Sequence, residues 1–590
     1  MSRFKVWAPA ATKVAVEIGD RRYPMTRGDG GWWFAQISLS ETDIDYAFVV
    51  DGDRPLPDPR SPWQPYGVHG PSRVVDHRVF PWTDRHWQAP PISAAVVYEL
   101  HIGTFTPAGT FSAAIDKLDY LVQLGVTHVE LMPVAEFPGT RGWGYDGVDL
   151  YAPHHAYGGP DGLKRLVDAC HARGLAVILD VVYNHLGPSG NYLATFGPYF
   201  TDRYATPWGQ AVNFDGPDSD SVRRFFCDNA LMWLRDYRFD ALRLDAIHAI
   251  LDTSAVHILE QLADEVAELE ARSGRHLVLI AESDLNDPRV VRPKAVGGYG
   301  IQCQWNDDFH HALHTLLTGE RNGYYADFGS VADLAKALQG AFIYDGRYSA
   351  FRRRRYGRSP DGLSGFSFLG YLQNHDQVGN RATGERSSHL MSHGRLKIAA
   401  ALVFTAPFIP MLFQGEEWGA STPFLYFTDH DDPELGRAVT EGRRREFAAF
   451  GWKPEDIPDP QASASFEASK LDWRERDRPP HGGLLDWHRR LIRLRRQTPT
   501  LSNGRLEGVQ VTFDEHAKWL VMRRDSVAVL CNFAGVAQAV PTATGPDPQI
   551  LLASDEACRI TQDTAELPAE SVAVISTDPE LAFPPGADDA

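Results

Sequence analysis

Cysteine is scarce in this chain of 590 residues. The cysteines are odd in number, widely scattered and without a Cys-x-x-Cys pair: Cys170, Cys227, Cys303, Cys531 and Cys558. A disulfide framework needs paired cysteines, and a structural zinc site usually takes closely spaced ones. The sequence therefore argues against both.

Long apolar runs are also missing. No uncharged apolar segment reaches the roughly 18 residues that a membrane-spanning helix needs. The first residues, Met1–Trp7, lack the apolar stretch of a secretion signal. We therefore expect no membrane partner and a cytoplasmic location.

Positive charge is in the minority, with 58 Lys and Arg against 77 Asp and Glu and a net charge of −19. This balance argues against nucleic acid as a partner. The one basic run, Arg352–Arg355, is too short to outweigh the whole chain, and we interpret it as a solvated loop. The length allows several domains and a large core.

Short alternating strands dominate residues 1–92. Four are predicted: 4–7, 13–18, 32–37 and 45–50. Glycine-rich turns separate them, as in a small β-sandwich. Prolines between Pro55 and Pro91 indicate a linker to the next domain.

From Ala95 onward, apolar strands alternate with amphipathic helical segments. The candidate strands are 96–100, 127–131, 176–180, 241–245, 277–282, 301–305, 368–373 and 408–413. One of the predicted helices covers Gly162–Ala172 and ends at Gly174. The pattern predicts an α/β fold, a TIM (β/α)8 barrel over residues 93–500. A doubly wound sheet is the alternative, but no Gly-x-Gly-x-x-Gly turn follows the first strand.

Two further parts of the chain depart from the barrel pattern. The segment at about 186–237 is too long for a simple crossover and predicts a folded insertion over the active face. After residue 500 the pattern returns to short strands at 509–513, 519–522 and 527–531. We therefore expect a C-terminal β-domain at 501–590.

Several predicted strands end in chemically active side chains. Arg243 and Asp245 close one strand two residues apart, and so share a face. Glu282 closes the next strand, and His375-Asp376 follows a later one. In a barrel these carboxyl ends converge on one face, where the active site lies.

Cleavage of a glycosidic bond needs one ionised and one protonated carboxyl group. Arg243 favours the ionised form of Asp245, and the apolar run before Glu282 predicts a raised pKa for that acid. Asp376 is a third carboxylate that could stabilise a cationic transition state. A single such residue is more often structural; Asp180 is expected to orient its neighbours, and Trp143, Trp208 and Trp305 could be core.

Four motifs resemble the signature regions of the α-amylase superfamily: 180–185, 242–246, 281–283 and 373–377. The resemblance implies retaining chemistry on α-glucans, with Asp245 as nucleophile, Glu282 as acid/base and Asp376 as transition-state stabiliser. Asn184 occupies a position that binds calcium in some amylases. The other ligands cannot be placed, so we predict no metal and no cofactor.

Three further motifs resemble the maltooligosyltrehalose trehalohydrolases within that superfamily: 304–311, 374–381 and 427–434 with 441–447. The resemblance implies cleavage of the α-1,4 bond beside a terminal trehalose, downstream of a maltooligosyltrehalose synthase, with no implied contact between the two enzymes. The predicted substrate-binding residues are Tyr145, His185, Trp208, Arg243, His248, Trp305, Asn306, Asp307, Asp308, His310, His375, Gln377 and Asn380.

Two other functions remain open at this point. An isoamylase-type debranching or a branching enzyme acting on α-1,6 linkages would share every catalytic residue. A glucan-binding protein without activity is the third reading, but a binder has no need of an acid and a nucleophile.

Overall fold

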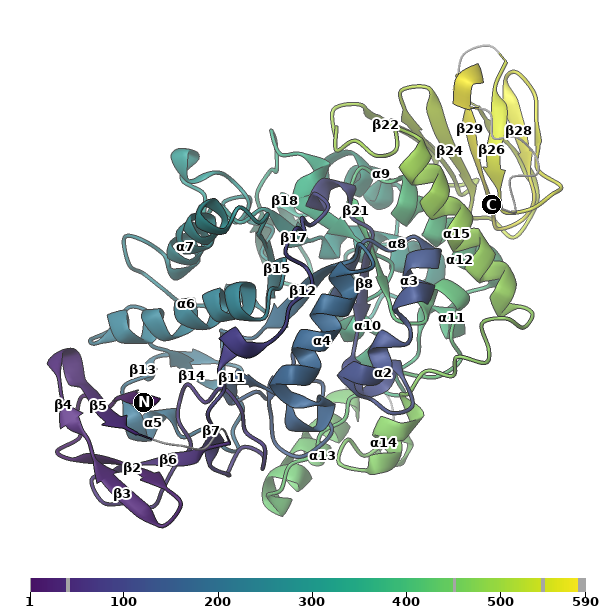
Figure 1. Ribbon diagram of the computed structural model, residues 1–590. Helices are drawn as coiled ribbons and strands as arrows, with labels where there is room; N and C mark the ends of the chain where they lie inside the picture. Colours follow the sequence, from purple (N-terminus) through teal and green to yellow (C-terminus); the bar gives the residue numbers. More distant parts are fainter. Residues whose placement is uncertain (1, 39–42, 449–452, 543–546, 582–590) are drawn as a thin grey trace.

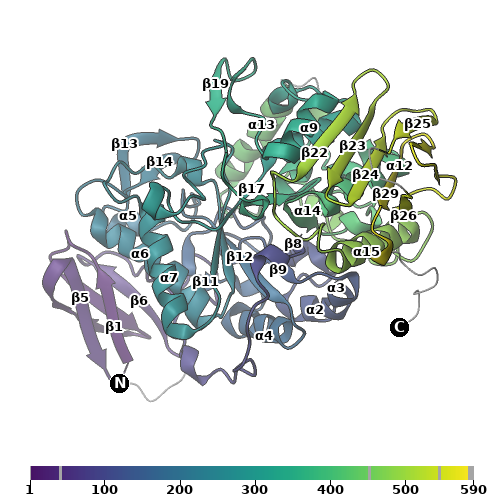
Figure 2. The ribbon, with the colours of Figure 1, turned by 90° about the horizontal axis from the view of Figure 1, so that it is seen from above.

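The computed structural model describes residues 2–38, 43–448, 453–542 and 547–581 (Figures 1 and 2). The chain begins with two small antiparallel sheets. One has the order β1 (Ser2–Trp7), β5 (Trp32–Ile37), β4 (Thr26–Arg27), and the other β3 (Arg21–Pro24), β2 (Val14–Ile18), β6 (Asp45–Val50), β7 (Ser72–Arg73). The four predicted strands are confirmed. The two-residue strands β4 and β7 are too short to show a period in the sequence.

A closed parallel barrel forms the centre of the molecule. Its strands, in spatial order, are β12 (Ala176–Val181), β15 (Ala241–Leu244), β16 (Val278–Ala281), β17 (Cys303–Trp305), β20 (Phe368–Gly370), β21 (Ile409–Phe413), β8 (Val97–Leu100) and β9 (His128–Leu131). The predicted barrel strands are thus confirmed, with ends that differ by a few residues. Closure of the sheet excludes the doubly wound alternative.

Helices cover the outside of the barrel (Figure 1). In α4 (Gly159–His171), the spacing of Leu163, Leu166, Val167 and Cys170 places these apolar side chains on one buried face. That face packs on β12, and the predicted helix at 162–172 is confirmed. The other long helices are α6 (Ser219–Asp236), α7 (Ile258–Ser273), α8 (Asp307–Thr318), α12 (His393–Thr405) and α15 (His481–Gln497).

The segment predicted as an insertion contains α5 (Leu193–Phe196) and the hairpin β13 (Phe200–Thr206)–β14 (Gly209–Val212). Its last part is α6, which connects β12 to β15 in the way that a parallel crossover requires. A second excursion separates β17 from β20 and contains α9 (Val331–Gly340) and the hairpin β18 (Asp345–Ser349)–β19 (Arg354–Gly357).

The basic run at 352–355 is not wholly a solvated loop, as the sequence analysis interpreted it. Arg352 lies over the Tyr356 ring at 4.0 Å and pairs with Asp284 at 2.8 Å. The run ends inside β19, so the hairpin uses two of its arginines as strand residues.

The C-terminal part returns to antiparallel sheets. One has the order β22 (Val509–Asp514), β23 (Trp519–Arg524), β24 (Val527–Asn532), β29 (Ser571–Ser576), β26 (Gln549–Ala553), and the other β25 (Gln538–Pro541), β28 (Thr564–Leu567), β27 (Arg559–Ile560). The expected C-terminal β-domain is confirmed. The boundaries at 92 and 500 stay predictions, and residues 582–590 lie outside the described residues.

Within the ranges that the structure describes, no helix has the length and apolar character to cross a membrane.

Candidate active site

The carboxyl ends of the barrel strands open into a cavity of about 420 Å³. Asp245 directly follows β15, and Glu282 directly follows β16. His375 and Asp376 begin α10 (His375–Gly379), which four residues separate from the end of β20. All four side chains line the cavity, so the three predicted catalytic carboxyl groups meet in one place.

Arg243 connects the acidic groups from below. Its Nη1 lies 2.7 Å from Asp180 Oδ2 and 2.9 Å from Asp245 Oδ1, and its Nη2 lies 3.2 Å from Glu282 Oε2. The arginine side chain is fully buried on β15. Without water to compete, its charge acts strongly on these neighbours. One guanidinium therefore holds Asp245 and Glu282 at opposite ends of the same planar group.

Asn184 and the residue after Asp245 hold the two carboxyl groups. Asn184 Nδ2 donates to Asp245 Oδ2 at 2.6 Å and to its backbone oxygen at 2.8 Å. The residue that follows Asp245, Ala246, has a φ of 40°, which a non-glycine residue adopts only at a cost. In this conformation its N–H donates to Glu282 Oε2 at 2.5 Å. Asn184 thus orients Asp245, and the strained turn orients Glu282.

The surroundings of Glu282 favour its protonated form. Burial raises the pKa of Glu282; Arg243 lowers it and Asp245 raises it again, with a net value of about 8. Glu282 therefore carries a proton at neutral pH and can give it to a leaving group. Burial also raises the pKa of Asp180, to about 6, against the opposing effect of Arg243.

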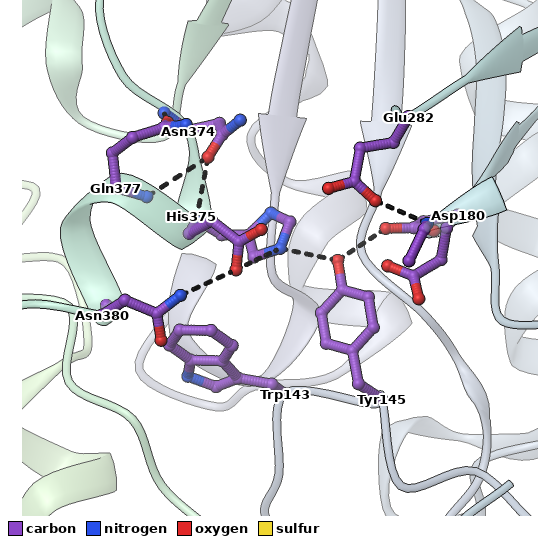
Figure 3. A network of polar contacts seen from close by, with 12 residues as sticks. Trp143, Tyr145, Asp180, Glu282, Asn374, His375, Gln377 and Asn380 are labelled. Atoms are coloured by element: carbon purple, nitrogen blue, oxygen red, sulfur yellow. Dashed lines mark hydrogen bonds and ion pairs between the residues drawn. The ribbon is translucent and has the colours of Figure 1, made fainter. Parts of the chain in front are cut away.

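A chain of polar contacts crosses the floor of the cavity (Figure 3). The Tyr145 hydroxyl donates to Asp180 Oδ2 at 2.6 Å and lies 2.8 Å from His375 Nε2. The side chain of Asn374 accepts from the backbone N–H of Asp376 and so caps α10. This cap fixes the first turn, from which His375 and Asp376 project.

Aromatic side chains form part of the cavity wall. Trp208 lies between β13 and β14 and stacks on His185, with ring centroids 4.6 Å apart and planes 8° from parallel. Trp208 is 48% exposed, which leaves ring surface open to solvent. Exposed indole beside a polar cleft is a surface on which a sugar ring can stack.

Comparisons with known proteins match this architecture. The family model "Alpha amylase, catalytic domain" matches residues 79–202, and a "Domain of unknown function (DUF3459)" matches residues 504–574. The malto-oligosyltrehalose trehalohydrolase of Rhizobium sp. (strain M-11) is 50% identical, over 97% of each chain. That of Arthrobacter ramosus is 54% identical, over 84% of this chain and 87% of its own.

The chain belongs to the malto-oligosyltrehalose trehalohydrolase family. It is therefore a glycoside hydrolase of the α-amylase type. The crystal structure of a putative alpha amylase from Salmonella typhimurium is 38% identical, covers 97% of each chain, and superimposes with a TM-score of 0.89. The resemblance drawn from the sequence motifs is confirmed.

In this trehalohydrolase-family chain, part of the predicted substrate-binding set lines the cavity with the three carboxyl groups. These residues are Tyr145, His185, Trp208, His248, His375 and Asn380. Their roles toward substrate stay predictions.

The other predicted substrate-binding residues do not line the cavity: Arg243, Trp305, Asn306, Asp307, Asp308, His310 and Gln377. Arg243 and Trp305 fill the barrel interior. Asp308 accepts from the backbone N–H groups of Ile343 and Tyr344 at 2.6 and 2.8 Å. His310 contacts the Leu372 carbonyl and the Tyr325 hydroxyl.

The remaining three also have partners inside the protein. Asn306 caps the start of α8, and Gln377 accepts from the backbone N–H of Asn374 at 2.8 Å. Asp307 accepts from the Tyr371 hydroxyl at 2.5 Å. The side chains of the motif at 304–311 that are named here thus have partners inside the protein, and any contact with substrate stays a prediction.

Two cavity segments contribute lining residues that the sequence analysis did not name, such as Phe137, Arg141 and Tyr426. The loop from Phe137 to Asp146 joins β10 (Ala135–Glu136) to β11 (Asp149–Pro153), and residues 426–430 follow β21. Arg141 Nη2 pairs with Asp429 Oδ1 at 2.8 Å and so ties the two segments together. The motif at 427–434 did point to the second segment, but only because it resembles a motif of the trehalohydrolases.

One group of side chains in the described parts of the chain has the spacing of metal ligands. The ligand atoms of Glu136, His154 and His155 lie within 4.8 Å of one another. Glu136 already accepts from the backbone N–H and the ring of His155 at 2.8 and 2.6 Å. An internal ion pair accounts for these contacts. Asn184, the possible calcium ligand, donates a hydrogen bond to Asp245.

Proposed function

We propose that this chain hydrolyses the α-1,4-glucosidic bond beside the terminal trehalose of maltooligosyltrehalose, releasing trehalose and a maltooligosaccharide. The reaction class is carried by one observation, the contact of the Arg243 guanidinium with both Asp245 and Glu282 at the mouth of the barrel. The choice of substrate is supported by identity of 50% to a malto-oligosyltrehalose trehalohydrolase over nearly the whole of both chains.

In the proposed mechanism, Asp245 attacks the anomeric carbon while Glu282 gives its proton to the glycosidic oxygen. The trehalose unit leaves, and a glycosyl ester on Asp245 remains. Glu282, now a carboxylate, takes a proton from water, which hydrolyses the ester with net retention at the anomeric carbon. Asp376, beside the cavity floor, stabilises the oxocarbenium-like transition states.

Selection of the trehalosyl substrate belongs to the leaving-group side of the cavity in this proposal. An α,α-1,1 unit has no reducing end and bends differently from a maltose unit. A site that hydrogen-bonds its hydroxyl groups would discriminate strongly, because an analogue that misses those bonds leaves buried polar groups unpaired.

A product analysis tests the proposal. The enzyme is incubated separately with maltotriosyltrehalose, maltopentaose and a branched glucan, and products are identified by chromatography and by proton NMR of the new anomeric centre. We expect trehalose and α-maltotriose from the first substrate and slow reaction with the others. Rapid release of linear chains from the branched glucan would instead mean a debranching enzyme.

Two further expectations stay predictions. The synthase that supplies maltooligosyltrehalose precedes this enzyme in the proposed sequence of reactions, with no contact between them implied. The cytoplasmic location also stays a prediction.

A further inference from the structure

Glu99 lies beneath His375 in the barrel interior. Its Oε1 is 2.5 Å from His375 Nδ1, and its Oε2 accepts from the backbone N–H of the same residue at 3.1 Å. Both side chains are 1% exposed. Glu99 belongs to β8 and does not line the cavity, so it cannot bind substrate itself. Both of its side-chain contacts are made to His375, which lines the cavity.

The hydrogen atoms along this chain of contacts can be counted. The Tyr145 hydroxyl has one hydrogen, and the carboxylate of Asp180, 2.6 Å away, has none to offer when ionised. Tyr145 therefore donates to Asp180, and the 2.8 Å contact with His375 Nε2 needs a hydrogen on that nitrogen. Nδ1 faces the Glu99 carboxylate, which is an acceptor as well. Both ring nitrogens then carry hydrogen.

We propose that Glu99 is a positioning residue that holds His375 as an imidazolium, so that His375 donates toward Tyr145 at the floor of the active site. Glu99, His375, Tyr145 and Asp180 then form one chain in which every hydrogen bond has a donor and an acceptor. The ring charge also lies beside Asp376, whose Oδ1 is 3.5 Å from His375 Nε2. The inference rests on the proposed function for its consequence in catalysis.

The electrostatic surroundings of His375 agree with a charged ring. Burial lowers the pKa of His375, but Glu99 and Asp376 raise it to about 9. The titratable and charged groups that face the ring from the packed elements are Glu99, His101, Glu130, Tyr145, Asp180, Arg243 and Asp376. Burial raises the pKa of Tyr145 as well, so this hydroxyl keeps its single proton.

Glu130 offers a matched control. It is the register neighbour of Glu99 on β9 and is 1% exposed, as Glu99 is. Its two carboxyl oxygens have no hydrogen-bond partner among the described residues, and burial raises its pKa well above the ordinary value. It is therefore a neutral acid at the same depth in the barrel, without a contact to His375.

Three variants separate charge from shape. Glu99→Gln keeps the shape, and its amide can donate to Nδ1 of a neutral ring that still carries hydrogen on Nε2. Glu99→Asp keeps the negative charge but shortens the reach. Glu130→Gln makes the same substitution at a glutamate that is paired with Glu99 in the sheet and equally buried. Circular dichroism and thermal unfolding establish that each variant is folded, and Glu99→Asp carries the test if Glu99→Gln does not fold.

The measurement is 15N NMR of histidine-labelled protein, with the His375 ring identified by its loss in His375→Asn. We expect two protonated ring nitrogens in the parent, in Glu99→Asp and in Glu130→Gln at neutral pH, and one in Glu99→Gln. A neutral ring in the parent, or a charged one in Glu99→Gln, would overturn the proposal. Because no substrate is present, the outcome does not depend on whether the proposed function holds.

Kinetics give the second readout. Glu99→Gln should lower kcat about tenfold and shift the pH profile, because the active site loses the imidazolium charge of His375. Glu130→Gln should leave the profile in place. An equal shift in both variants would show that any change at this depth has the same effect, and would remove Glu99 from this role.

Discussion

The guanidinium of Arg243 lies over the indole ring of Trp305, with Cζ 4.1 Å from the ring centroid. Trp305 is 1% exposed at the end of β17. A desolvated cation–π contact of this kind is worth about 2 kcal/mol. The indole thus fixes the plane of the group that Asp245 and Glu282 both contact. The predicted contact of Trp305 with sugar stays a prediction, and its contact with Arg243 gives it a supporting role.

The first prediction concerns this support. Trp305→Leu should lower the free energy of unfolding by about 3 kcal/mol, because a large buried ring is lost. It should also lower kcat more than it raises KM, since the carboxyl groups lose their alignment. Denaturant unfolding and steady-state kinetics check both effects.

The matched control for this prediction is Trp208→Leu. Trp208 is half exposed on a hairpin at the cavity, so its loss should leave the unfolding free energy within about 0.5 kcal/mol and act mainly on KM. If Trp305→Leu raised only KM, as a lost sugar contact would, the supporting role of Trp305 would be wrong.

The second prediction concerns pH. Glu282 must be protonated to act as an acid, so kcat/KM should fall as pH rises through about 8, the value to which burial and neighbouring carboxylates raise the pKa of Glu282. Asp307 contributes to that rise. Asp307→Asn should therefore move the alkaline limb to lower pH. The pH dependence of kcat/KM on maltotriosyltrehalose measures the shift.

Asp361→Asn, an exposed change far along the chain from these groups, serves as the control. Its profile should coincide with that of the parent. An alkaline limb that moved upward in Asp307→Asn would contradict the assignment of this limb to Glu282, because removal of a negative neighbour cannot raise the pKa of an acid.

Much of the barrel could be predicted because its strands are buried on both sides. The run at 176–181 is buried along its whole length, and its first four residues form a continuous apolar segment before Asp180. A carboxylate such as Asp245 breaks this pattern at the strand end, where the active site of a barrel lies. An apolar run that ends in a carboxylate therefore predicts the strand and the candidate catalytic residue together.

Contacts between distant segments could not be predicted in this way. Glu99 and His375 are 276 positions apart, and only closure of the barrel brings them together. The cavity wall at Phe137–Asp146 has no period, because its shape depends on ties such as Arg141 to Asp429. Conversely, Asp308 looks like a site residue in sequence, although its carboxylate accepts from backbone N–H groups at 343 and 344.

The third prediction follows from this difference. Asp308→Ala leaves the two backbone N–H groups and the Asn286 amide, 2.7 Å away, without their acceptor. We expect a loss of about 3 kcal/mol in the free energy of unfolding, since hydrogen bonds to a buried charged group are among the strongest. Asp308→Asn, which keeps one acceptor oxygen, should lose less. Chemical denaturation gives both values.

Substrate preference distinguishes the two roles of Asp308. The ratio of maltotriosyltrehalose to maltopentaose hydrolysis is measured for the folded variant below its unfolding transition. A stable Asp308→Ala enzyme with a changed ratio would show that Asp308 acts in substrate binding. We expect the ratio to change less than the stability.

The fourth prediction separates chemistry from binding at Asp245. Asp245→Ala should lower kcat by several orders of magnitude, because the nucleophile acts mainly in the transition state, whereas binding uses the whole cavity. Calorimetric titration with maltotriosyltrehalose should give a Kd within about tenfold of KM in the parent enzyme. Asn184→Ala, which removes the amide that holds Asp245 and contacts the His185 ring, should lower kcat by about tenfold and leave the product anomer unchanged. Near-normal turnover in Asp245→Ala would require another nucleophile, and the cavity offers only Glu282, Asp376, Asp146 and Asp429 as further carboxylates in the described part of its lining.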